Sequence, residues 1–168
     1  MRSDALPESG EACSQSRMTN LAETISAGPA PEAARGLLAA ANLPTSGLTD
    51  EQLAKFFYCG LATAPSALIG LEIYGADALL RSLVVDPTVR SKGLGSALVE
   101  RAEAHSAVHG VGTLYLLTTT AEGFFARRGY RRIDRTVAPA AIRSTREFAG
   151  LCPASSAFMF KRLWLYER

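Results

Sequence analysis

The chain has few of the residues that build disulfide frameworks or metal centres. Its 168 residues include two histidines and three cysteines, Cys13, Cys59 and Cys152. The cysteines are odd in number, lie far apart and form no Cys-x-x-Cys pair, so neither a set of disulfides nor a structural zinc site is expected. We predict no metal centre.

The sequence also lacks an excess of charge and a long apolar run. Its 18 Lys and Arg residues nearly balance 16 Asp and Glu residues, and the net charge of +2 leaves no broad basic surface for a nucleic-acid backbone. No apolar stretch approaches the roughly 18 residues of a membrane span, and the N-terminus lacks the apolar core of a signal peptide. We expect a soluble, cytoplasmic protein with no nucleic-acid or membrane partner.

The length predicts one domain with a core of its own. Residues 1–20 are rich in Ser, Glu and Gly and show no periodicity, which is typical of a flexible extension. The sequence therefore predicts an N-terminal extension over residues 1–20 and a single domain over residues 21–168.

The most informative motif is Arg90-Ser91-Lys92-Gly93-Leu94-Gly95, which lies between an apolar strand pattern and a helical pattern. Two glycines let the backbone turn and expose N–H groups, and the helix that follows directs its positive dipole end to the same place. Arg90 and Lys92 add full charges. The loop therefore predicts a phosphate site. It is no dinucleotide fingerprint, because the third glycine would fall at Leu98, and its end lacks the Gly-Lys-Ser/Thr of a P-loop.

Hydrophobic periodicity and turn residues predict a mixed order of helices and strands. Thr49 and Gln52 have the spacing of a capping box. Helices are expected over residues 31–42, 49–56, 94–108 and 122–128, and strands over residues 24–26, 56–61, 67–74, 78–85, 113–118, 130–133 and 157–162. Three of these strands form a meander that leads into the glycine loop. Strand 113–118 should run parallel to strand 78–85, because a helix joins them.

Two motifs together carry a family resemblance. Arg90-x-x-Gly93-x-Gly95 resembles motif A of the GCN5-related N-acetyltransferase (GNAT) superfamily, and residues 121–130 resemble its motif B. The resemblance implies the α/β (α+β) GNAT fold, with a mixed sheet of about six or seven strands, about four flanking helices and two parallel strands that splay at the acetyl-CoA site.

The same resemblance implies acetyl-CoA as the co-substrate, without a metal. In the family the glycine loop binds the pyrophosphate, and main-chain groups of the preceding strand pair with the pantetheine arm. The cofactor-binding residues implied here are Leu83, Val84, Val85, Arg90, Ser91, Lys92, Gly93, Leu94, Gly95, Ser96, Thr119, Phe124, Phe125 and Arg128.

Acetyl transfer to an amine needs a base for the ammonium and an acid for the departing thiolate. Glu72 lies among apolar residues of a strand, an environment that suits a base, although an edge glutamate facing solvent is the alternative. The tyrosine that usually serves as acid in the family is replaced by Phe125, which leaves Tyr130, Tyr115, Thr118, Thr119 or solvent. The predicted catalytic residues are Glu72, Tyr130 and Ser82.

A charged residue in an apolar strand needs a partner. Arg81 must meet an anion, which is either Glu72 or a carboxylate of the substrate. The predicted substrate-binding residues are Glu72, Tyr74, Arg81, Ser82, Thr118 and Arg143.

A narrower resemblance concerns residues 70–75, 80–83, 116–125 and 140–153, which are similar to acetyltransferases associated with arsenic-resistance operons. It implies detoxification by acetylation of a small amine such as arsinothricin or phosphinothricin, both glutamate mimics. Arg81 and Arg143 would then hold two anions while Glu72 takes the proton. A non-catalytic acyl-CoA sensor and a protein N-acetyltransferase are the alternatives, and a homodimer is left open.

Overall fold

The structure is a computed structural model that describes residues 25–163, so the predicted extension of residues 1–20 lies outside it. Its strands form one mixed sheet in the order β1-β2-β3-β4-β5-β7-β6. The strands are β1 (Ile25–Ala27), β2 (Phe57–Leu61), β3 (Ala64–Tyr74), β4 (Asp77–Val85), β5 (Thr113–Thr118), β6 (Arg131–Arg132) and β7 (Ala157–Arg162). The helices are α2 (Pro31–Ala40), α3 (Asp50–Leu53), α4 (Leu94–Val108), α5 (Glu122–Ala126) and α6 (Ala140–Arg143), with 3-10 turns η1 (Pro87–Val89) and η2 (Arg135–Val137) and a π-helical turn η3 (Glu147–Leu151).

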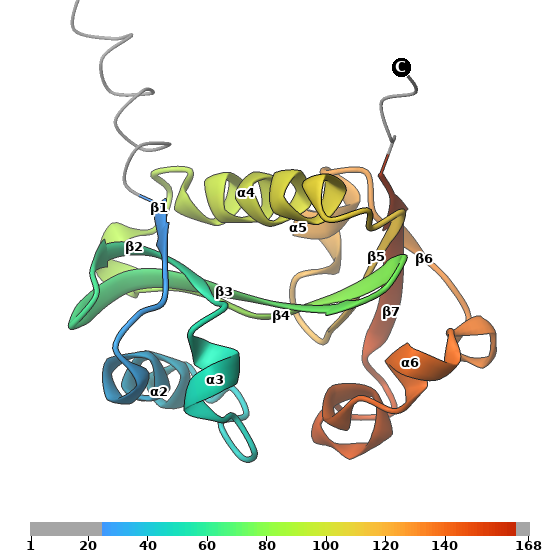
Figure 1. The fold of residues 1–168 in the computed structure, drawn as a ribbon, viewed down its shortest axis with the longest axis horizontal. Helices are drawn as coiled ribbons and strands as arrows, with labels where there is room; N and C mark the ends of the chain where they lie inside the picture. The colour runs from blue at the N-terminus through green and yellow to red at the C-terminus, as the bar shows by residue number, and fades with distance from the viewer. Residues whose placement is uncertain (1–24, 164–168) are drawn as a thin grey trace, which may run out of the picture.

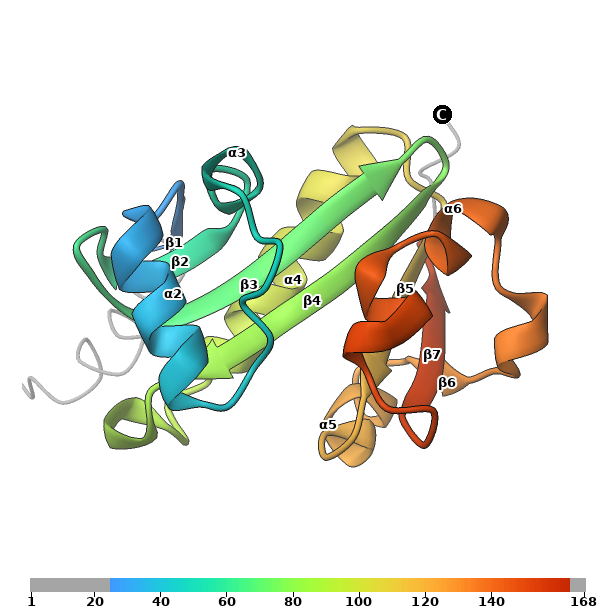
Figure 2. The ribbon, with the colours of Figure 1, turned by 90° about the horizontal axis from the view of Figure 1, so that it is seen from below.

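Helices cover both faces of the sheet. One face, here called the α4 face, carries α4 and α5, whereas the opposite face, here called the α2 face, carries α2, α3 and α6 (Figure 1). Seen from below, α2 and α3 lie over one half of the sheet, and α6 and η3 lie over the other half (Figure 2). The mixed α/β architecture expected from the sequence is confirmed.

The connections follow the predicted order. β2, β3 and β4 form an antiparallel meander, and β4 pairs with β5 in parallel after the chain has passed through α4. α4, β5 and β7 have the predicted bounds. Thr49 and Gln52 form the predicted capping box, in which each side chain accepts a hydrogen bond from the other residue's backbone N–H.

Other bounds differ from the prediction. The helix predicted over residues 31–42 ends at Ala40, where the chain turns through Asn42, which has a φ of +57°. The helix predicted over residues 122–128 ends at Ala126, and Gly129 has a φ of +90° that is incompatible with a continuing helix. The strand predicted over residues 130–133 pairs with β7 only at residues 131–132.

Apolar side chains pack between the sheet and the helices on each face, because successive strand residues point to opposite faces. Ala78 and Leu80 of β4 belong to the cluster under α4, whereas Leu79 packs with Ile142 and Phe158 on the α2 face. Within residues 25–163, no helix is long and apolar enough to span a bilayer, and no group of three or more His, Cys, Asp or Glu residues gathers as metal ligands would.

Gly70 of β3 leaves the space that two large side chains occupy. A Cβ at this position would lie 2.5 Å from Cζ of Phe56 and 2.8 Å from Cγ of Arg81. We therefore expect Gly70→Ala to lower the free energy of unfolding by about 1–3 kcal/mol, as overpacking does in a filled core, and to displace Arg81. Urea-induced unfolding followed by circular dichroism measures the effect.

Gly36 in the middle of α2 provides the matched control. A Cβ there would meet nothing within 4 Å. Gly36→Ala should stabilise the protein by about 0.5–1 kcal/mol, because alanine loses less backbone freedom than glycine in a helix. Equal effects of the two substitutions would contradict the close packing at Gly70.

Candidate active site

A cavity opens where β4 and β5 separate. Their parallel pairing ends at Leu80 and Leu116, and beyond these residues the strands line a cavity of about 450 Å³. Ser82 and Leu83 form one wall, and residues 117–120 form the opposite wall. The predicted splayed parallel strands are thus present, and a cavity lies between them.

A β-bulge distorts β4 at this point. Between the pairs Leu68–Val84 and Gly70–Arg81, β4 holds one residue more than β3. Ser82, one of the two bulged residues, has a φ of +56°, which is uncommon for a residue with a side chain. The bulge takes the backbone of Ser82 and Leu83 out of the ladder with β3, beside the cavity.

The predicted phosphate loop leads from β4 into α4. Ser91 and Gly93 have φ values of +67° and +78°, and Gly93 is the residue before the helix. The N–H groups of residues 94–96 have no carbonyl behind them within the helix, so they are available to an anion. Arg90 is exposed, and its Nε donates a 3.3 Å hydrogen bond to the carbonyl of Val85. These residues, with Lys92, fit a pyrophosphate group.

α5 packs against the start of α4. Nη1 of Arg128 donates a 2.7 Å hydrogen bond to the carbonyl of Phe124, Nη2 contacts Oγ of Ser96, and the guanidinium lies 3.5 Å from the centroid of the Phe124 ring. A Cβ at Gly95 would lie 3.4 Å from the same ring. Arg128 therefore adds a positive charge beside the loop and connects α5 to it.

Phe125 and Thr119, two further predicted cofactor residues, line the cavity. Phe125 is buried, and its ring packs edge-on against that of Tyr130 at 5.5 Å between centroids. The position of the usual acid is thus an apolar part of the wall.

Tyr130 does not belong to this wall. Its side chain is buried, and its hydroxyl donates a 3.0 Å hydrogen bond to Glu103, which Lys161 contacts at 2.9 Å. Burial, with the charge of Glu103, raises the pKa of Tyr130 far above its usual value. Tyr130 therefore takes part in a cluster with Glu103 of α4 and Lys161 of β7. The structure does not bring this predicted catalytic residue to the cavity.

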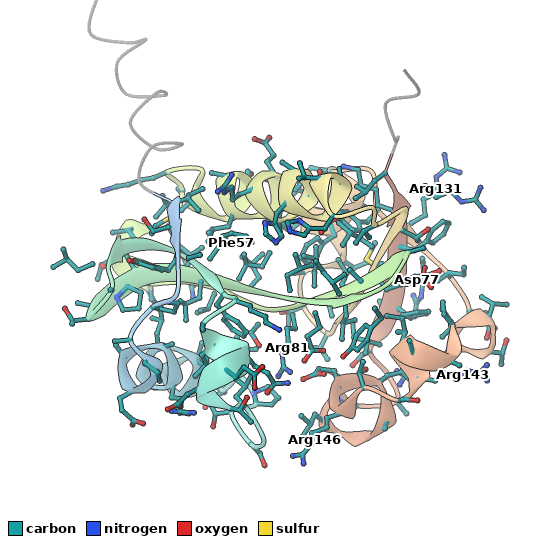
Figure 3. All side chains as sticks on the ribbon, viewed as in Figure 1. Phe57, Asp77, Arg81, Arg131, Arg143 and Arg146 are labelled. Atoms are coloured by element: carbon teal, nitrogen blue, oxygen red, sulfur yellow. The ribbon has the colours of Figure 1, made fainter. Side chains whose placement is uncertain are left out.

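A buried ionic cluster lies on the α2 face beside the cavity. Nη1 of Arg81 contacts both Glu72, at 3.2 Å, and Glu147, and the side chains of the three residues are 6%, 13% and 7% exposed respectively. Arg81 points from the sheet into the space between the two groups of helices (Figure 3). Of the two alternatives for its anion, the structure contains Glu72, and it adds Glu147. We call these three residues the ionic cluster.

Glu72 has further donors. Nε2 of Gln52 lies 3.3 Å and the Tyr74 hydroxyl 3.1 Å from its carboxylate oxygens. Burial and the Glu72 charge raise the pKa of Tyr74 to about 12, so its hydroxyl remains protonated. Glu72 and Tyr74 line a different cavity of about 530 Å³, at the end of β3 beside α3 and α4. That cavity includes neither the separated strands nor the loop, so we take the first cavity as the candidate site.

Arg143 lies apart from both cavities. It is exposed on α6, at the periphery of the molecule (Figure 3). The predicted pair of Arg81 and Arg143 is therefore not brought together. Ser82 and Thr118 do line the first cavity with Arg81, and Oγ1 of Thr118 accepts a 3.0 Å hydrogen bond from the N–H of Ala121.

Part of the cavity wall was not predicted as a site. The turn after α2 contributes residues 42–44, and the segment before β7 contributes residues 151–153 and Ser156. Burial raises the pKa of the Cys152 thiol, which keeps it protonated near neutral pH. Glu147 was also missed, although the segment 140–153 contributed to the narrower resemblance, because the sequence contains no periodic pattern that would place it beside β4.

Comparisons with known proteins agree with this geometry. Residues 53–132 match the family model described as acetyltransferase (GNAT) domain. A curated relative, "Uncharacterized N-acetyltransferase CT2212" of Chlorobaculum tepidum, is 43% identical over 63 residues. The match covers 38% of this chain and 40% of that protein.

Solved structures show the same fold. N-acetylglutamate synthase from Neisseria gonorrhoeae, complexed with coenzyme A and N-acetyl-glutamate, aligns with a TM-score of 0.69 and 18% identity over 83% of this chain and 35% of that chain. Rv2747 from Mycobacterium tuberculosis, in complex with CoA and NLQ, aligns with a TM-score of 0.67 and 19% identity over 83% of this chain and 99% of that chain. At these identities the likeness shows the GNAT fold.

The contacts of Tyr130 lead to a first test of the site. Tyr130→Phe removes the hydrogen bond to Glu103, and we expect a loss of about 1 kcal/mol in the free energy of unfolding. Any acetyl transfer that the parent protein catalyses should keep its pH profile in this variant. Loss of the alkaline part of that profile would instead make Tyr130 the acid.

Proposed function

We propose that this chain, which has the GNAT fold, is an acetyl-CoA-dependent N-acetyltransferase that acetylates the amine of a small molecule. One observation carries the proposal: the free edge of β4 lies beside the cavity and leads directly into the loop and the start of α4. The phosphates, the pantetheine arm and the thioester of acetyl-CoA would follow one another in that order. Coenzyme A in the Neisseria and Mycobacterium structures supports this assignment.

Each part of the co-substrate has residues that suit it. Ser91, the N–H groups of residues 93–96, and the charges of Arg90, Lys92 and Arg128 would hold the pyrophosphate. Leu83, Val84 and Val85 would pair with the pantetheine amides, because β4 bonds to β3 on one edge and its other edge is not bonded to β5 there. Phe124, Phe125 and Thr119 would pack against the arm and the thioester.

The thioester supplies an activated acetyl group. The protein must orient this group, remove a proton from the ammonium of the acceptor and allow the departing thiolate to be protonated. Holding amine and thioester together is worth about 7 kcal/mol or more in favourable cases. Ser82, at the bulge, would hydrogen-bond to the thioester carbonyl, and Thr118 would do so from β5. Because Phe125 has no proton to give and Tyr130 faces Glu103, solvent in the cavity would protonate the thiolate.

The proposal also concerns the chemical class of the acceptor amine. The narrower sequence resemblance supports a toxin with a primary amine, such as arsinothricin or phosphinothricin, and a role in arsenic or toxin resistance. Arg81 lines the cavity, and because its Nη1 already contacts Glu72 and Glu147, the carboxylate of such a substrate would have to meet other N–H groups of the guanidinium. Arg143 is exposed on α6, away from this cavity, so the second anion of the substrate would have to be held elsewhere.

A non-catalytic acyl-CoA sensor is the second candidate, and Phe125 at the position of the usual acid favours it. Release of CoA thiol from acetyl-CoA decides between the two when it is measured with arsinothricin, phosphinothricin, amino acids, polyamines and aminoglycosides. Turnover of one amine supports the enzyme. Tight binding of acetyl-CoA without turnover of any amine supports the sensor, and absence of binding contradicts both.

Gly93→Val tests the phosphate loop. The residue has a φ of +78°, which a β-branched side chain adopts only at a large cost, so the loop must change shape. We expect acetyl-CoA to bind at least about tenfold more weakly, a loss of about 1.4 kcal/mol, in isothermal titration calorimetry.

Gly110→Val is the matched control. Gly110 has a φ of +80° at the other end of α4, and a Cβ at either glycine meets nothing within 4 Å. Both variants carry the same backbone strain, but only Gly93 lies in the loop. Similar weakening of binding by both would show that strain in α4, rather than the loop, is responsible.

A further inference from the structure

The candidate site has a small side chamber. A cavity of about 80 Å³ adjoins the large one, because both are lined by Arg81, Ser82, Leu117 and Cys152. Leu80, the last residue of β4 that pairs with β5, also lines both cavities. A liquid water molecule takes about 30 Å³, so the chamber has room for an amino group and the carbon that bears it. The chamber therefore lies at the point where β4 and β5 separate.

Glu147 forms part of this chamber, and Arg81 is the cationic side chain that contacts its carboxylate. Glu147 is 5% exposed, and neither carboxylate oxygen accepts a well-aligned hydrogen bond from residues 25–163, although Nη1 of Arg81 contacts one of them. It begins the π-helical turn η3, in which the N–H of Cys152 bonds to the Glu147 carbonyl five residues earlier. Such turns occur often at functional sites.

Glu147 differs in this respect from Glu72. The second carboxylate of the ionic cluster accepts from Gln52, Tyr74 and Arg81, and it does not line the side chamber. Two carboxylates share one guanidinium, so with both carboxylates ionised the cluster carries one net negative charge in a buried place. One guanidinium does not fully compensate two buried carboxylates, so a second cation beside Glu147 would stabilise the cluster.

We propose that Glu147 receives the ammonium group of the acceptor in the side chamber and takes its proton, while Glu72 positions Arg81. The inference rests on the proposed function and adds the catalytic base. It also revises the sequence-based hypothesis for Glu72, whose carboxylate already has three donors and lines a different cavity.

The proton and electron balance is complete with acetyl-CoA as the other reactant. The ammonium gives one proton to Glu147, and the neutral nitrogen attacks the carbonyl carbon of the thioester. A C–N bond forms and the C–S bond breaks, with its electron pair on sulfur. The acylated nitrogen loses its second proton, which neutralises the thiolate through solvent, and Glu147 releases its own proton before the next turnover.

The surroundings of Glu147 suit a base. Burial raises the pKa of Glu147, whereas Arg81 on β4 opposes this effect and Glu72 on β3 adds to it. Tyr74 and Cys152 are the other titratable groups that interact with Glu147, and burial raises the pKa of each, so both are uncharged at neutral pH. Since a base acts only when ionised, kcat should fall as the pH is lowered through the raised pKa of Glu147.

Glu147→Gln, compared with Glu72→Gln, tests the proposal. Each variant removes one negative charge and one partner of Arg81 without a change in size. On an amine that the parent acetylates, we expect Glu147→Gln to lower kcat by about 10²–10⁴ and to abolish the acidic limb of the pH profile, with unchanged affinity for acetyl-CoA. Glu72→Gln should lower kcat less and keep that limb.

The outcomes separate this proposal from the one on which it rests. A parent protein without turnover on any amine overturns both. A parent that turns over, with the same pH profile in Glu147→Gln or with equal loss in both variants, overturns the role of Glu147 alone. Should Glu147→Gln fail to fold, Glu147→Asp retains the charge and should lower kcat and shift the acidic limb. An unshifted limb in that variant also overturns the role.

Discussion

The parallel pairing of β4 with β5 covers only Asp77–Leu80 and Thr113–Leu116, and the candidate site depends on where it stops. β5 pairs with β7 over its whole length, and this antiparallel partner holds β5 while β4 continues toward the loop. Backbone groups on the free edge of β4 then lie beside a cavity instead of a strand. A strand edge in such a place is stable when an extended ligand with amide groups pairs with it.

The charged side chains on the two faces of the sheet have different roles. On the α4 face, Glu103 binds Lys161 and Tyr130 and so connects α4 with the strands near β7. On the α2 face, Arg81 contacts two carboxylates, and that of Glu147 accepts no well-aligned hydrogen bond from the described residues. The first set of contacts is satisfied within the protein and adds to stability. The second is incomplete, and an incomplete buried network is where a ligand is expected to bind.

Local signals explain what the sequence could predict. The bounds of α4, β5 and β7, the capping box at Thr49 and the meander all follow from periodicity and from residues a few positions apart. The ion pair of Arg81 with Glu72 could be predicted for a related reason. Gly70 pairs with Arg81, so Glu72 lies two residues further along the same face of the adjacent strand.

Contacts between distant segments could not be predicted in this way. Glu147 lies in a π-helical turn outside any periodic pattern, and its position beside Arg81 depends on how the segment before β7 folds over the sheet. Tyr130 was predicted as a catalytic residue because Phe125 replaces the usual tyrosine of motif B, but its hydroxyl donates a hydrogen bond to Glu103 on α4. Backbone pattern identifies which strand a residue belongs to, whereas the direction of a side chain at a strand end depends on tertiary packing.

The bulge at Ser82 has a consequence for how β4 tolerates change. Before it, Leu80 packs under α4, and Arg81 faces the opposite side; after it, Leu83 and Val85 pack under α4 and Val84 faces α2. Simple alternation from Leu80 would give residues 83–85 the reverse orientation. β4 thus consists of two short strands of opposite side-chain parity. Loss of Ser82 would restore simple alternation and pair Leu83 with Ile69, with Leu83 and Val85 still under α4 and Val84 still facing α2. The core therefore does not need the extra residue, and its effect is confined to the backbone beside the cavity.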